Sequence, residues 1–149
     1  MSTYMFFYVR KDDTFTCINC LYKSSAIYGV FSPYMSYEDV VHIDSIIDRV
    51  RADCREIVDG LNRKRKEYKR KIAAITQTNS PIAEKMKCID MYYELLDDVK
   101  QKLDEHKSVF YFCNFLEDIL DCNKGNEKPI LYAGIETGYD ITWEDIEKE

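Results

Sequence analysis

Two cysteines lie three positions apart near the start of the chain, at Cys17 and Cys20. A C-x-x-C pair is the usual half of a structural zinc site, which needs four convergent ligands. The sequence offers no matching second pair, and a regular strand over 15–22 would turn the two side chains to opposite faces. We therefore expect buried thiols and no bound cofactor, and keep Cys17 and Cys20 as the first candidate metal ligands.

A second set of candidate ligands combines carboxylates with a histidine. Glu38 and His42 are four residues apart, and so are Glu117 and Asp121. If both segments were helices of one hairpin, the four side chains would face one another, as metal ligands do in helical bundles. Only one histidine is present and the Glu-x-x-His pattern is absent, so a solvated charged flank is the simpler interpretation.

The segment RKRKEYKRK, residues 63–71, carries seven basic residues and one acid. Such a run is typical of a phosphate-binding patch, although nucleic-acid binding would gain from interleaved aromatic residues and only Tyr68 is present. The alternatives are a docking surface for an acidic protein partner and a solvated helix face near a helix C-terminus. The candidate binding residues are Arg63, Lys64, Arg65, Lys66, Lys69, Arg70 and Lys71.

Acidic residues dominate the second half of the chain. A row of carboxylates on one helix could imitate a phosphate backbone or dock a protein; the alternative is pairing with Arg49, Arg51 and Arg55. The residues of this acidic docking face are Asp97, Asp98, Asp104, Glu105, Glu117, Asp118 and Asp121.

The sequence shows no arrangement for nucleophilic or acid–base catalysis. It lacks G-x-S-x-G, a phosphate-cradling glycine loop and H-E-x-x-H, and it contains only two histidines. We therefore expect the protein not to be an enzyme.

Composition agrees with one ordinary folded domain. The 149 residues are 46% hydrophobic and 32% charged, with a net charge of −6. Residues 1–79 have a charge balance of +3 and residues 80–149 one of −9. No apolar run reaches the ~20 residues of a membrane helix, and the N-terminus does not resemble a signal peptide. A cytoplasmic protein with six reduced cysteines is expected, in the host cytoplasm if it is viral.

Both ends of the chain predict β structure. Residues 4–10 and 15–22 are aromatic and β-branched, and Asp12 and Asp13 between them favour a turn, which predicts a hairpin. A short helix over 26–31, capped by Ser24 and stopped by Pro33, follows. Residues 130–136 predict a returning strand, and residues 142–149 a final helical turn.

Two long helices are predicted between these strands, over 37–77 and 82–122. SYED at 36–39 resembles a capping box, and TNSP at 78–81 breaks the pattern. The first apolar stripe is Ile43, Ile47, Val50, Cys54, Ile57, Leu61, Tyr68, Ile72 and Ile75. The second is Ile82, Met86, Ile89, Tyr93, Leu96, Leu103, Phe110, Cys113 and Leu120. Both have heptad spacing, although residues 109–115 could also form a strand.

The short connection makes the helices antiparallel, with Val50 near Ser108 and Ile72 near Met86. The predicted fold is therefore α+β: a long antiparallel, coiled-coil-like helical hairpin on a small antiparallel β unit made from both chain termini. Residues 1–149 are predicted to form a single domain. Its parts are 1–35 (β-hairpin and short helix), 36–122 (helical hairpin) and 123–149 (returning strand and terminal turn).

The expected function is that of a small interaction module, because a rigid helical hairpin presents long rows of side chains to a protein partner. Two hairpins could also pair into a homodimeric bundle. The form suits an accessory or inhibitor protein of a virus or mobile element. The alternatives are a nucleic-acid-associated protein using residues 63–71 and a metal-binding protein; no membrane association is expected.

Overall fold

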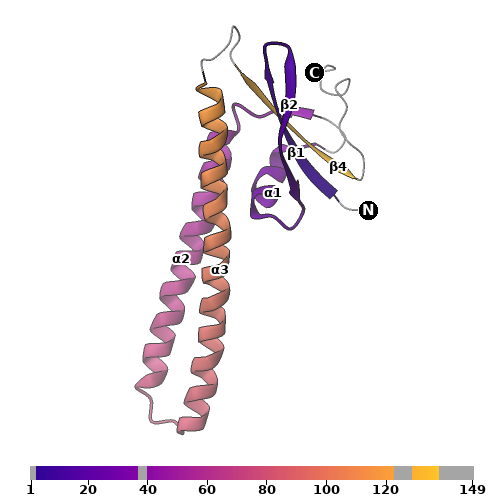
Figure 1. Cartoon of the computed structure of the whole chain (residues 1–149). Helices are drawn as coiled ribbons and strands as arrows, with labels where there is room; N and C mark the ends of the chain where they lie inside the picture. Colours follow the sequence, from indigo (N-terminus) through magenta and orange to yellow (C-terminus); the bar gives the residue numbers. More distant parts are fainter. Residues whose placement is uncertain (1–2, 37–39, 123–128, 138–149) are drawn as a thin grey trace. The chain divides into compact units, whose positions relative to one another are not determined.

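The computed structural model describes residues 3–36, 40–122 and 129–137. Their elements are β1 (Thr3–Lys11), β2 (Thr14–Tyr22), α1 (Ala26–Phe31), a 3₁₀ turn (Ser32–Tyr34), β3 (Val40–His42), α2 (Ile47–Thr76), α3 (Ile82–Leu120) and β4 (Ile130–Thr137) (Figure 1). The chain divides into two compact units. We call residues 1–54 with 108–149 the base unit, and residues 55–107 the distal hairpin. The α+β class and the helical hairpin are confirmed, whereas the single-domain organisation stays a prediction.

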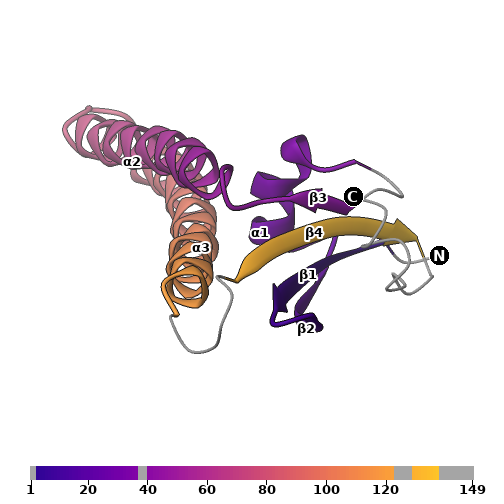
Figure 2. The ribbon, with the colours of Figure 1, turned by 90° about the horizontal axis from the view of Figure 1, so that it is seen from above.

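The base unit contains one antiparallel sheet with strand order β2–β1–β4–β3 (Figure 2). Asp12 and Asp13 join the first two strands with φ angles of 50° and 63°. Two consecutive positive φ values define the type I′ turn that matches the twist of a hairpin, and aspartate tolerates them well. The predicted hairpin is thus confirmed, and the returning strand pairs with β1 as expected.

The main core lies between one face of the sheet and the helices of the base unit. Phe7 from β1 packs edge-on against Phe31 of α1 and Phe112 of α3, with ring centroids 5.2 and 4.8 Å apart. Val50 and Leu116 are fully buried as well. Residues 109–115 are therefore helical, since their apolar side chains meet the core at helical spacing. Ser25, not the predicted Ser24, caps α1.

The start of the first long helix differs from the prediction. Val40–His42 form the edge strand β3, and α2 begins only at Ile47. The backbone N–H of Ile43 donates to the Leu131 carbonyl at 3.0 Å, and Asp44 accepts from the Leu131 N–H at 2.9 Å. These bonds satisfy the edge of β4, which favours an extended segment at 40–43 over another helical turn. Residues 37–39 of the predicted capping box at 36–39 and the predicted terminal turn at 142–149 lie outside the described residues.

The distal hairpin consists of the C-terminal part of α2 and the N-terminal part of α3. Tyr68 packs against Tyr92 with ring centroids 5.9 Å apart, and Lys71 lies 5.7 Å from the centre of the Tyr92 ring. Leu61 and Val99 are its only buried residues among those described. Two helices alone can cover only one narrow strip of each other, so this unit has little core of its own.

Candidate protein-interaction surface

The two N-terminal cysteines face the same side of the sheet, contrary to the prediction. A β-bulge at Ile18 breaks the alternation of β2, so that Cys17 pairs with Tyr8 and Cys20 with Phe6. Tyr8 and Phe6 are two residues apart on β1 and therefore share a face, which their cross-strand partners also share. Both thiols are exposed, so the prediction that they are buried was wrong. Among the described residues, however, no three His, Cys, Asp or Glu side chains come together as metal ligands.

Two other cysteines are the buried thiols of the chain. Cys54 of α2 and Cys113 of α3 are fully buried in the base unit. Burial raises the pKa of each thiol to about 11, because desolvation disfavours the thiolate. Buried in this way, the two cysteines pack as small apolar core residues.

In the part of the chain that the structure describes, the predicted carboxylate–histidine cluster does not come together. His42 belongs to strand β3, so it cannot share a helical face with Glu38, which lies outside the described residues. The His42 ring instead lies 3.5 Å from the Asp44 carboxylate. Glu117, for its part, accepts a hydrogen bond of 2.6 Å from Arg51. The four residues were predicted to converge only because the first helix was placed ten residues too early.

Arg51 joins the two long helices within the base unit. Its guanidinium donates to Glu117 at 2.6 Å and to Asn114 at 3.0 Å on α3, and to Asp48 at 3.2 Å on its own helix. Arg51 therefore pairs with residues further along α3 than predicted, because the prediction placed its neighbour Val50 near Ser108. The bond from Arg51 lowers the pKa of Glu117 below its ordinary value of 4.5.

This pKa shift predicts a pH-dependent contribution to stability. A carboxyl group whose pKa is lowered by folding stabilises the native state above its ordinary pKa, and loses this contribution as the pH falls through the lowered value. Glu117→Gln is therefore expected to lower the free energy of unfolding at neutral pH, by up to about 1 kcal/mol because Glu117 is partly exposed. The difference from wild type should vanish in acid below the folded pKa.

Urea unfolding of both proteins across the acid range measures this difference. Asp118→Asn is the matched control, because Asp118 is exposed and has no cation within 4 Å among the described residues. A Glu117→Gln deficit that persisted unchanged in strong acid would assign the effect to packing and not to charge.

The predicted basic residues remain available on the surface of α2. Lys71 pairs with Glu67 at 3.2 Å. Within the described part of the chain the other six candidates have no carboxylate within 4 Å; they are Arg63, Lys64, Arg65, Lys66, Lys69 and Arg70. The run thus forms an exposed basic surface on the distal hairpin.

The predicted acidic residues are divided between the two units. Asp97, Asp98, Asp104 and Glu105 belong to the distal hairpin, whereas Glu117, Asp118 and Asp121 belong to the base unit. Several are paired: Asp98 with Lys102 at 3.0 Å, Asp104 with Lys107 at 3.5 Å, and Glu117 with Arg51. The acidic docking face therefore stays a prediction.

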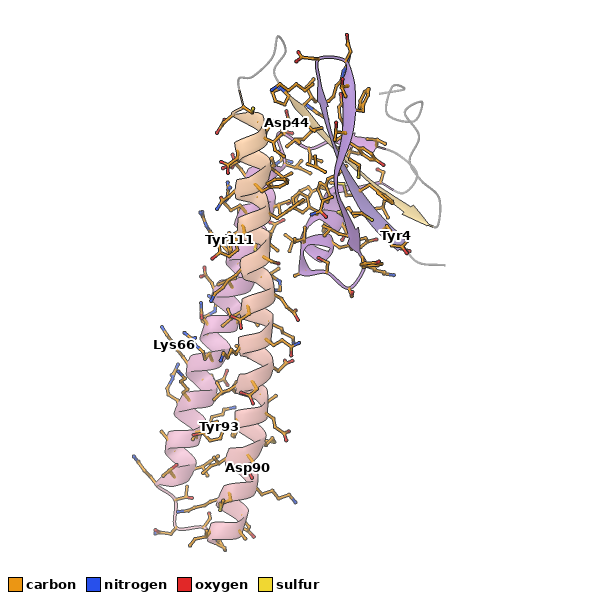
Figure 3. The ribbon with its side chains drawn as sticks, in the orientation of Figure 1. Tyr4, Asp44, Lys66, Asp90, Tyr93 and Tyr111 are labelled. Atoms are coloured by element: carbon orange, nitrogen blue, oxygen red, sulfur yellow. The ribbon has the colours of Figure 1, made fainter. Side chains whose placement is uncertain are left out.

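One surface feature that the sequence did not predict is apolar. The structure leaves Ile82, Met86 and Tyr93 exposed, by 76, 58 and 54% respectively, although all three were predicted on the inner stripe of the second helix. The less exposed side of α3 is formed instead by a neighbouring stripe of residues: Lys85, Ile89, Tyr92, Leu96, Val99, Leu103 and His106. Figure 3 labels Tyr93 among the side chains of α3. We call Ile82, Met86 and Tyr93 the apolar strip.

This strip belongs to a wider concentration of exposed apolar side chains. Nine large apolar side chains are exposed in the described residues, and six of them lie in the distal hairpin: Ile57, Ile82, Met86, Met91, Tyr93 and Leu95. Met91 and Leu95 lie on the other side of α3 from the strip, so the candidate interaction site is the strip itself, whose three residues share one side of the helix.

None of the helices in the part of the chain that the structure describes is long and apolar enough to cross a membrane. No protein-family model matches the chain, and no curated protein or solved structure is significantly similar to it.

Proposed function

We propose that this protein is a small non-enzymatic interaction module, which binds a protein partner through the distal hairpin. The observation that carries the proposal is the exposure of the apolar strip on a unit with only two buried residues among those described. A partner that covered Met86 and Tyr93 would remove apolar surface from water, at roughly 25 cal/mol per Å². The role of an accessory or inhibitor protein belongs to the same proposal, as does a cytoplasmic location.

A second candidate function is nucleic-acid binding by the basic run. It is favoured by the six cations of residues 63–70 that have no carboxylate within 4 Å in the described chain. Against it stand the net charge of −6 and the single aromatic residue within the run, Tyr68, which packs against Tyr92. Protein binding is therefore the better supported function.

The test compares two double variants in co-purification of the tagged full chain from a lysate of its source. Met86→Glu with Tyr93→Glu should lower the recovery of the stoichiometric partner protein at least about tenfold. An untagged second copy of the chain counts as such a partner. The control, Met91→Glu with Gln101→Glu, adds the same charge at exposed positions of α3 away from the flank that carries the strip and should retain the partner.

Three outcomes are informative. Loss only in the Met86 and Tyr93 variant supports the proposal. Equal recovery from both variants, or no stoichiometric protein at all, contradicts it. A salt-sensitive gel shift that disappears when Arg63, Lys64, Arg65 and Lys66 are reversed to glutamate would support the second candidate function instead.

A further inference from the structure

The apolar strip shares one flank of the distal hairpin with a basic residue of the other helix. The less exposed stripe of α3, together with the stripe of α2 that it faces, forms the seam between the two helices. Met86 and Tyr93 each come one residue after a member of this stripe, so both occupy the heptad position called e. In an antiparallel pair the e positions of both helices lie on the same flank, and on α2 the residue that follows Tyr68 of the seam is Lys69. The 5.9 Å contact between Tyr68 and Tyr92 puts Lys69 and Tyr93 at nearly the same level.

Charges of opposite sign border this flank. One helical turn outward from the e positions lie Lys66 on α2 and Asp90 and Asp97 on α3; Figure 3 labels Lys66 and Asp90. In the distal hairpin α2 has eight basic and three acidic residues, a balance of +5. The α3 part has five basic and seven acidic residues, a balance of −2. At the flank positions alone the balance is +2 on α2, where Asp59 opposes Arg55, Lys66 and Lys69. It is −1 on α3, where Lys100 and Lys107 only partly offset the three aspartates Asp90, Asp97 and Asp104. The flank is therefore net basic along one helix and net acidic along the other.

We infer that this flank binds a second copy of the chain, and that the two hairpins lie parallel around a two-fold axis that runs along the helices. That axis places α2 of one copy against α3 of the other. Lys66 and Lys69 then face Asp90 and Asp97 of the second copy, and the two-fold axis produces this pairing twice. The opposite orientation would bring α2 against α2 and place like charges together.

The size of the flank is sufficient for a stable dimer. Residues 82–107 extend for about 40 Å at 1.5 Å per residue, and two helices side by side are roughly 20 Å wide. The resulting face of roughly 800 Å² matches what each partner contributes to a standard protein interface. Tyr93 would lie near its centre and Met86 towards one end, and both gain from a four-helix arrangement because the hairpin alone leaves them exposed.

The experiment is sedimentation velocity on the full chain, over a range of concentrations up to about 100 µM. Wild type should dimerise. Lys66→Glu with Lys69→Glu, and separately Asp90→Lys with Asp97→Lys, should each weaken dimerisation at least about tenfold, because each places like charges together on both sides of the axis. An equimolar mixture of these two variants should dimerise again, since each supplies the charge that the other lacks.

The control is Arg63→Glu with Lys87→Glu, which reverses charges on the outer sides of the two helices and should dimerise like wild type. Circular dichroism must show unchanged helix content in every variant that is compared. A wild-type chain that stays monomeric throughout, or charge variants that fail to recover on mixing, would overturn the inference.

This inference rests on the proposed function, but the two can fail separately. If the chain is monomeric and a different protein is lost with Met86→Glu and Tyr93→Glu, the proposed function holds and the second copy is excluded. If neither association is found, both are overturned.

Discussion

Replacing Phe112 by alanine is expected to destabilise the base unit by about 3–5 kcal/mol, the range for large aromatic residues removed from a packed core. Phe112 is 7% exposed, and its ring meets both Phe7 and Phe31 edge-on. The three rings come from α3, β1 and α1, so the substitution removes the contact that joins three elements. A loss of this size is a large share of the total stability of a domain.

Phe115→Ala provides the matched control, because Phe115 is on the same helix but 45% exposed. Its substitution should cost less than about 1 kcal/mol. Urea unfolding followed by circular dichroism measures both changes. If the two variants were equally stable, Phe112 would not be the core residue that its burial indicates.

The second large effect is expected in the distal hairpin. Val99 is 3% exposed and one of two buried residues there. Val99→Asp would place a carboxylate without a counter-charge in the seam, where an uncompensated buried charge costs about 3–5 kcal/mol. Because this unit has little core of its own, we expect residues 55–107 to lose structure while the base unit stays folded.

Hydrogen exchange resolved by residue tests this expectation. In the Val99→Asp variant, protection should fall at least about tenfold across the distal hairpin and remain unchanged in β1 and β4. Lys100→Asp, at the exposed neighbouring position, should leave protection in both units unchanged. Uniform loss across the chain would show instead that the two units unfold together.

The regular elements could be predicted because their sequence signals are local. Asp12 and Asp13 favour the hairpin turn by their own conformational preferences. The absence of glycine and proline between Pro81 and Gly125 favours one long second helix, and TNSP marks the connection before it. Each of these signals acts over a few neighbouring residues, so no knowledge of the tertiary contacts was needed.

Strand β3 and the bulge could not be predicted, since distant residues decide them. Val40–His42 is a strand because β4, almost a hundred residues later, presents an unpaired edge. Ile18 is bulged because of its register with β1, and this bulge alone brings Cys17 and Cys20 to one face. Local spacing predicted a helix in the first case and opposite faces in the second.

The apolar strip was missed for a related reason. Two heptad stripes on α3 share Ile89, Leu96 and Leu103, and the sequence of this helix alone does not distinguish them. The choice is made by α2, whose Tyr68 packs against Tyr92 and turns Tyr93 outward. The stripe that contains Tyr92 also contains the apolar residue Val99, between Leu96 and Leu103. This residue was the signal that could have identified the correct stripe.

The central claim is that Met86 and Tyr93 belong to a surface that binds a second copy of the chain. It is tested most directly by sedimentation velocity on wild type beside the Met86→Glu, Tyr93→Glu variant. We predict a concentration-dependent dimer for wild type and a folded monomer for the variant under the same conditions. Identical sedimentation of the two proteins at every concentration would contradict this account.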